Sequence, residues 1–191
     1  MSKSRDGKRF ENFIAIFMGP MKSGKSLQLA IFASKYGKTM DVLVVKPKID
    51  TTSSEDEISS RAGLNVECIS VENLSDLEGR KEFSEAQIIL IDECQFFSDL
   101  KTHVLKWRAS KSYVLGSLDA DDQQKPFGQI WSLIPYARKV KKLTALCEFC
   151  KDGSLAIATI SVGQKGAQIE IDDRNHSQYR SVCEFHITNR T

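Results

Sequence analysis

The stretch FIAIFMGPMKSGKSLQLAIFASKY, residues 13–36, decides the fold of this chain. Its first part, Phe13–Met18, is a short apolar run that ends at a glycine, which is typical of a buried strand. Its last part, Lys25–Tyr36, is long enough for a helix and is followed by the plausible stop Gly37. The residues between them fit G-x-x-x-x-G-K-[ST] at every fixed position. The stretch therefore predicts a strand, a phosphate-binding loop and a helix.

This loop has the residues that a nucleoside triphosphate needs. Two glycines let successive backbone N–H groups turn inward toward phosphate oxygens, and the helix adds the positive end of its dipole. Lys25 is placed to reach the β- and γ-phosphates, and Ser26 to bind Mg²⁺. The alternative is a chance match in a Gly/Ser turn, which the flanking strand and helix disfavour. The predicted ATP-binding residues are Gly19, Pro20, Met21, Lys22, Ser23, Gly24, Lys25 and Ser26.

The apolar run Ala86–Asp92 ends in an acid, Asp92, and a second acid, Glu93, follows it directly. At the end of such a strand in P-loop proteins, the aspartate orients Mg²⁺, so Asp92 is the second magnesium candidate after Ser26. Glu93, the next residue, is placed to act as a base beside the γ-phosphate. The alternative is a solvated acidic turn, because acids favour turns in general. With the phosphate-binding loop upstream, the catalytic interpretation is favoured, and Glu93 and Lys25 are the catalytic candidates.

The apolar runs and helical stretches alternate over most of the chain, which predicts an α/β fold with a mainly parallel sheet flanked by helices. Residues 47–63 are polar and predict a loop. Further strands are expected at 41–46, 65–71, 86–92 and 112–118, and helices at 74–84 and 100–109. From Cys147 onward the pattern changes to short alternating strands, at 156–160 and 167–171. We therefore expect a polar tail over 1–12, a P-loop domain over 13–145 and a small C-terminal β lobe over 146–191.

Two short motifs in this C-terminal lobe have metal-ligand spacing: Cys147-Glu148-Phe149-Cys150 and Cys183-Glu184-Phe185-His186. Two residues between ligands let a tight turn present both side chains to one Zn²⁺, and two such turns complete a tetrahedron. The long separation between the turns is the weak point of this interpretation, and four unrelated residues are the alternative. The sequence predicts a closed, structural zinc site made of Cys147, Cys150, Cys183 and His186.

Composition excludes some classes of protein. A net charge of +2 in 191 residues does not favour a nucleic-acid or membrane surface. No apolar stretch approaches the roughly 20 residues of a membrane-spanning helix, and the polar N-terminus lacks the apolar core of a secretory signal. We expect a cytoplasmic protein, a compartment in which clustered cysteines favour metal over disulfides.

In this order, these features resemble the cytosolic-type thymidine kinases, a family with a P-loop domain and a zinc-bearing lasso domain. The resemblance extends from about Phe13 to His186. Besides GPMKSGKS it is carried by KPKIDT at 46–51, DECQFF at 92–97, LDADDQQKPFG at 118–128 and YRSVCEFH at 179–186.

The resemblance implies an ATP-dependent transfer of the γ-phosphate to the 5′-hydroxyl of a deoxynucleoside, first of all thymidine. Glu93 matches the family's base, Asp92 and Ser26 its Mg²⁺ positions, and Asp50 an acid near the site of transfer. A homotetramer and feedback inhibition by the end-product triphosphate are also implied. The residues that match positions around the thymine ring are Met21, Phe96, Leu118, Phe127 and Tyr179, and a flat base buries well between such side chains.

The sequence departs from the family pattern at three places. Asp122 stands where the family usually has an aromatic residue, Thr52 where an arginine is common, and residues 172–175 interrupt the lasso where glycines are expected. A carboxylate beside the base can change the preferred nucleoside. The alternatives are a nucleotide-binding protein with altered specificity or reduced catalysis, and a nucleic-acid-dependent ATPase. Against the latter, the chain has no second motor domain and no basic stripe.

Overall fold

A computed structural model describes residues 2–3, 9–50, 57–59, 63–162 and 178–189. Its centre is a six-stranded sheet with the strand order β10-β3-β9-β8-β4-β7, in which every neighbouring pair is parallel. The predicted α/β class with a mainly parallel sheet is confirmed. The strands are β3 (Ile14–Met18), β4 (Val42–Pro47), β7 (Ile69–Val71), β8 (Ile88–Ile91), β9 (Ser112–Ser117) and β10 (Lys139–Lys142).

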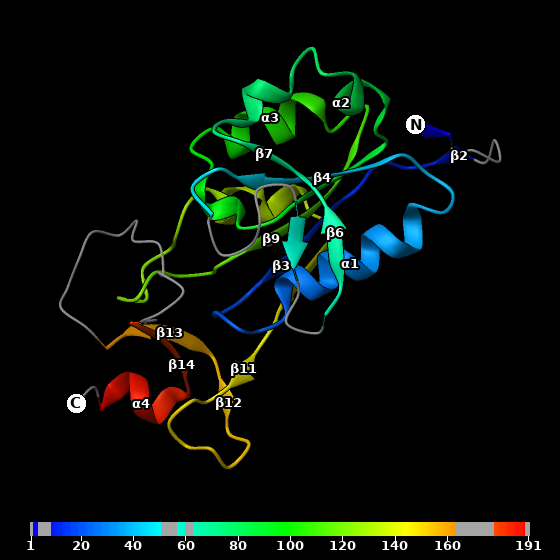
Figure 1. Ribbon diagram of the computed structural model, residues 1–191. Helices are drawn as coiled ribbons and strands as arrows, with labels where there is room; N and C mark the ends of the chain where they lie inside the picture. The colour runs from blue at the N-terminus through cyan, green and yellow to red at the C-terminus, as the bar shows by residue number, and fades with distance from the viewer. Residues whose placement is uncertain (1, 4–8, 51–56, 60–62, 163–177, 190–191) are drawn as a thin grey trace.

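Helices cover both faces of this sheet (Figure 1). Because successive strand residues point to opposite faces, Ile16 belongs to one core and Phe17 to the other. The Ile16 core is closed by α3 (Leu100–Trp107), by α2 (Lys81–Glu85) and by two 3₁₀ segments. The Phe17 core is closed by α1 (Lys25–Tyr36), through Leu29 and Phe32. The 3₁₀ segments are η1 (Leu74–Leu77) and η3 (Ile130–Tyr136); η2 (Cys94–Phe96) follows β8.

The C-terminal residues form a separate lobe beside one edge of the sheet (Figure 1). It contains two antiparallel pairs and a short helix, and a small core around Ile160 and Val182. The last strand of the large sheet ends at Lys142, and the first strand of the lobe begins at Ala145. The elements of the lobe are β11 (Ala145–Leu146), β12 (Leu155–Ala156), β13 (Ala158–Ser161), β14 (Tyr179–Val182) and α4 (Glu184–Thr188).

Several elements differ from those expected. The strand expected over 65–71 is two strands, because β6 (Asn65–Glu67) pairs with β5 (Glu57–Ser59) in a hairpin while β7 joins the main sheet. The 47–63 segment is therefore not only loop. The helix expected over 74–84 is a 3₁₀ turn followed by the short α2. The lobe strand expected over 156–160 is divided between β12 and β13. The expected strand at 167–171 lies outside the described residues.

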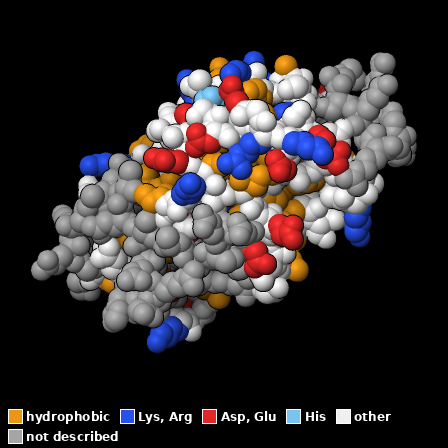
Figure 2. Space-filling model, turned by 45° about the horizontal axis from the view of Figure 1, so that its top comes forward, with side chains coloured by type: hydrophobic (Ala, Val, Ile, Leu, Met, Phe, Trp, Pro, Cys, Tyr) orange, Lys and Arg blue, Asp and Glu red, His pale blue; other side chains and the backbone are white. Residues whose placement is uncertain are grey.

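The face of the molecule seen in Figure 2 shows no dominant charge among the described residues. On the face that Figure 2 shows, acidic and basic side chains of the described residues are interspersed. The N-terminal segment contains the two-residue strands β1 (Ser2–Lys3) and β2 (Arg9–Phe10), which pair with each other. None of the helices in the described parts of the chain combines the length and apolar character needed to cross a bilayer.

Candidate active site

The phosphate-binding loop joins the end of β3 to the start of α1, as the sequence predicts. Gly24, just before the helix, has φ 85°, and Lys22 has φ 62°, so the loop twice enters the left-handed region. Gly19 has φ 153°, and a Cβ there would lie 2.4 Å from the carbonyl oxygen of Leu143. Close packing against the segment after β10 therefore requires glycine at the loop's first position.

Lys25 is directed back under this loop. Its side chain is buried, and its ammonium donates hydrogen bonds to the carbonyl oxygens of Pro20 (2.9 Å) and Gly19 (3.3 Å). A buried ammonium needs such partners to offset the loss of water. The positive charge is thus fixed beside the backbone amides that the motif provides for phosphate.

Asp92 follows β8 and reaches toward the loop. It is 3% exposed, accepts a hydrogen bond from the Ser26 hydroxyl, and accepts one from the Glu93 N–H at 3.0 Å. Burial, together with the neighbouring Glu93 carboxylate, raises the pKa of Asp92 to about 7, against the opposing effects of Ser26 and Lys25. The two predicted magnesium residues, Ser26 and Asp92, are therefore in contact.

This contact crosses a strand, because β9 lies between β3 and β8. Gly116 of β9 makes the crossing possible. A Cβ at this position would lie 2.9 Å from Oδ1 of Asp92 and 3.2 Å from Cδ1 of Leu29 in α1. The Asp92 carboxylate thus occupies the space that any other residue's side chain would fill.

Glu93 lies at the same carboxyl edge of the sheet and has φ 44° and ψ 40°, an uncommon conformation for a glutamate. Its carboxylate is held by Gln95, whose Nε2 donates to Oε2 of Glu93 at 2.5 Å. Oε1 of Gln95 accepts the N–H of Leu118 at 3.0 Å. The buried Gln95 amide thus fixes the Glu93 carboxylate relative to the segment that follows β9.

The two predicted metal-binding turns meet in the lobe. The Nδ1 atom of His186 lies 3.6 Å from the sulfurs of Cys147 and Cys150 and 3.4 Å from that of Cys183, and the Cys150 and Cys183 sulfurs are 3.6 Å apart. A tetrahedral zinc with ordinary Zn–S and Zn–N bonds has edges of about 3.6 to 3.8 Å. Burial opposes ionisation, but nearby backbone N–H groups lower the pKa of Cys147 to about 6. These four residues fit a zinc ion, although spacing in sequence alone left this open.

Comparison with known proteins decides the family. A sequence model described as "Thymidine kinase" matches residues 12–187. The thymidine kinase of Mesomycoplasma hyopneumoniae (strain 7448) is 33% identical, over 92% of this chain and 95% of that protein. That of Ureaplasma urealyticum serovar 10 is 35% identical, over 97% of this chain and 87% of the relative. Thymidine kinase a of Arabidopsis thaliana is 32% identical over 75% of this chain and 63% of the relative.

The chain belongs to the thymidine kinase family.

In this member of the thymidine kinase family, two of the residues expected around a thymine ring are in contact with each other. The rings of Phe96 and Phe127 meet edge to face with their centroids 5.6 Å apart. The backbone N–H of Leu118 donates to Oε1 of Gln95, the residue that precedes Phe96. Gly128, with φ 65°, packs so closely that a Cβ would lie 2.5 Å from the Gln95 carbonyl oxygen.

The other expected pocket residues lie on different elements. Met21 is in the phosphate-binding loop, and its backbone is bonded to β13 and β14. Tyr179 is the first residue of β14, and Asp50 lies in the turn after β4, where its N–H donates to the Pro47 carbonyl.

Asp122, where the family usually has an aromatic residue, lies at the tip of the segment after β9. The side chain of Asp121 closes this tip by accepting the N–H groups of Gln123 and Lys125, each at 2.9 Å. Asp122 itself is half-buried. The other departures from the family pattern, Thr52 and residues 172–175, lie outside the described residues.

Sequence reasoning missed several residues of this site. Gly116 gave a signal, since an isolated glycine in an apolar strand indicates a close approach of another group. Gln95 lies within the DECQFF motif, but only the left-handed turn at Glu93 brings its amide back onto the carboxylate. The remaining missed residues hold the phosphate-binding loop from the lobe: Glu148, Thr159 and Ser181.

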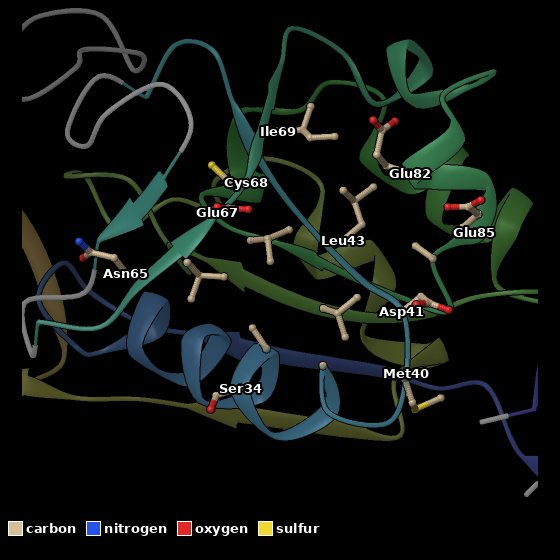
Figure 3. A pocket seen from close by; sticks show the side chains of 16 residues that line it. Ser34, Met40, Asp41, Leu43, Asn65, Glu67, Cys68, Ile69, Glu82 and Glu85 are labelled. Atoms are coloured by element: carbon tan, nitrogen blue, oxygen red, sulfur yellow. The ribbon is translucent and has the colours of Figure 1, made fainter. Parts of the chain in front are cut away.

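A separate groove of about 810 Å³ lies at the opposite end of α1 from this site (Figure 3). Leu43 and Ile69 are among its apolar lining residues, and Glu67, Glu82 and Glu85 are among its acids. It is formed where α1 ends and β4 begins, whereas the phosphate-binding loop lies where β3 ends and α1 begins. None of the predicted site residues lines this groove.

Proposed function

We propose that this protein transfers the γ-phosphate of ATP to the 5′-hydroxyl of thymidine, giving ADP and dTMP. Membership of the thymidine kinase family supports this reaction. The observation that carries the proposal is the contact between the loop and the acidic pair. Ser26 is hydrogen-bonded to Asp92, and Glu93 is held beside it by Gln95.

The roles that we propose follow from this arrangement. Residues 19–26 bind the phosphates through backbone N–H groups and Lys25. Ser26 and Asp92 hold Mg²⁺, which neutralises charge on the phosphates when bound. Glu93 accepts the proton of the 5′-hydroxyl as the new O–P bond forms and the bond between the β,γ-bridging oxygen and the γ-phosphorus breaks. The predominant contribution is positioning and charge neutralisation rather than proton removal, because the transition state is loose.

We propose that the thymine ring binds beside Phe96, Phe127 and Leu118, with Met21, Tyr179 and Asp50 completing the substrate site. The edge-to-face pair of phenylalanines supports this placement, because a flat base gains from burial against such faces. Asp122 is half-buried, and we expect its carboxylate to influence which nucleoside this site prefers. Turnover compared over a panel of pyrimidine and purine deoxynucleosides measures that choice.

We propose further that Cys147, Cys150, Cys183 and His186 bind a structural zinc ion, since their geometry fits one. The division into a tail over 1–12, a P-loop domain over 13–145 and a zinc-binding lobe over 146–191 is proposed on the change of sheet between Lys142 and Ala145. We propose a homotetramer on the family resemblance alone, and a cytoplasmic location on that resemblance together with the sequence features given above. Light scattering of the purified protein tests the first of these.

The test of the reaction is direct. Purified protein with thymidine, ATP and Mg²⁺ is expected to form dTMP and ADP in equal amounts. Lys25→Ala and Glu93→Gln are each expected to abolish turnover, while thermal melting shows that both variants are folded. Undiminished turnover in both variants would contradict the assigned roles. Nucleotide binding without turnover on any nucleoside would favour a binding protein instead, and stimulation of ATP hydrolysis by DNA would favour a nucleic-acid-dependent ATPase.

A further inference from the structure

The phosphate-binding loop is held at its apex by the C-terminal lobe. The Met21 N–H donates to Oγ1 of Thr159 at 2.9 Å, and the Ser181 hydroxyl donates to the Met21 carbonyl oxygen at 2.6 Å. Thr159 and Ser181 are cross-strand partners on β13 and β14, and both are buried. One pair of lobe residues thus fixes both backbone groups of a single loop residue.

A third connection runs through the first metal-binding turn. The Lys22 ammonium lies 2.5 Å from Oε2 of Glu148, which stands between Cys147 and Cys150. The other carboxylate oxygen, Oε1, accepts the N–H of Ser181 at 2.8 Å. The Glu148 N–H in turn donates to the Ser181 carbonyl oxygen at 3.0 Å. Glu148 therefore connects the first metal-binding turn both to Ser181, which holds Met21, and to Lys22 of the loop.

The loop needs support at this point. Lys22 has φ 62°, a backbone conformation that residues with a side chain rarely adopt unless their surroundings hold them there. The direction of the following N–H groups depends on this turn, and phosphate binding depends on that direction. A preorganised loop binds more tightly than one that must be ordered by its ligand.

We propose that Glu148 is a positioning residue for nucleotide binding, which acts through Lys22 and Ser181 to hold the phosphate-binding loop in its binding conformation. The proposal rests on the proposed function only in that the loop binds the phosphates of ATP. The competing interpretation is an ordinary surface ion pair, which contributes little. Three features oppose it: both side chains are only about one quarter exposed (24% and 25%), both oxygens of Glu148 are bonded, and the pair bridges two lobes.

The decisive variant is Glu148→Gln, which keeps an acceptor for the Ser181 N–H but removes the charge that holds Lys22. ADP affinity, measured by isothermal titration calorimetry, is expected to fall about threefold to tenfold, as for coupled neighbouring residues. The KM for ATP is expected to rise by a similar factor with little change in kcat, because Glu148 touches no reacting atom. Unchanged or tighter ADP binding would overturn the proposal.

The chain offers a matched control in the second metal-binding turn. Glu184 occupies the same place after Cys183 as Glu148 does after Cys147. Its side chain has no recorded hydrogen bond to the loop among the described residues, and it is exposed. Glu184→Gln removes the same charge from the same lobe and is expected to bind ADP as the wild type does. Zinc content and melting temperature, measured for both variants, separate loss of the lobe from loss of the contact.

The link is also testable from the loop side, which leaves the lobe unaltered. Lys22→Met is expected to weaken ADP binding as much as Glu148→Gln does, and the double variant is expected to add little further loss. Lys22→Arg, which can still pair with Glu148, is expected to restore most of the affinity. Losses that simply add would overturn the proposal. If wild-type protein itself binds no ADP, the proposed function fails rather than this inference.

Discussion

At the scale of single residues, the position of the proposed base, Glu93, depends on a neighbour that takes no part in the reaction itself. The Glu93 carboxylate is held by the amide of Gln95, and that amide is held by the backbone N–H of Leu118. An amide suits this place because it donates through nitrogen and accepts through oxygen at once. A side chain that lacked either function would leave Glu93 free to turn or Leu118 unpaired.

The first prediction follows from that arrangement. Gln95→Leu is expected to lower kcat about tenfold to a hundredfold, because a misplaced catalytic group is costly. ADP affinity is expected to be retained, since no described contact joins Gln95 to residues 19–26. Steady-state kinetics and calorimetry measure the two quantities. Gln123→Leu, at an exposed glutamine in the segment after β9, serves as the control. A kcat equal to that of the wild type would contradict a positioning role for Gln95.

At the scale of elements, the proposed magnesium ligands, Ser26 and Asp92, depend on the strand that lies between them. Gly116→Ala in β9 would place a methyl group 2.9 Å from Oδ1 of Asp92, so the carboxylate must shift and its bond with Ser26 is lost. We expect the Mg²⁺ concentration for half-maximal activity to rise about tenfold, the scale of effects around metal ligands. Titration of activity with Mg²⁺ measures it, and Mg²⁺-free ADP binding serves as control. An unaltered Mg²⁺ dependence would refute this account.

Elements that carry a local signal were predictable, and elements defined by distant partners were not. Helix α1 has the predicted bounds because strand, glycine loop and helix follow one another directly. Strand β10 was missed. Its sequence, KVKK, is exposed at all four positions, so it has no apolar pattern from which its pairing with β3 could be predicted. The Lys22–Glu148 pair joins residues 126 positions apart. Motifs thus indicated the candidate reacting groups, while the residues that contact and position them could be identified only from the fold.

At the scale of the whole molecule, the two lobes differ in how they are stabilised. The large sheet has an extensive core on each face, whereas among the described residues of the C-terminal lobe the buried apolar cluster comprises Cys147, Ala158, Ile160 and Val182. A cluster of this size gives little stability by itself, and metal binding can supply the remainder in such lobes. We therefore expect the lobe that holds the phosphate-binding loop to depend on the proposed zinc ion.

This dependence gives the last prediction. Freshly purified protein is expected to contain one zinc per chain by elemental analysis, the stoichiometry of one four-ligand site. Chelation under reducing conditions is expected to remove hydrogen-exchange protection from β13 and β14. Protection of β3, β8 and β9 is expected to remain, because none of the four proposed zinc ligands belongs to the cores of the large sheet. ADP affinity is expected to fall with the lobe's protection and to return when zinc is added. Protection of β13 and β14 that survives complete metal removal would show that the lobe is held by packing alone.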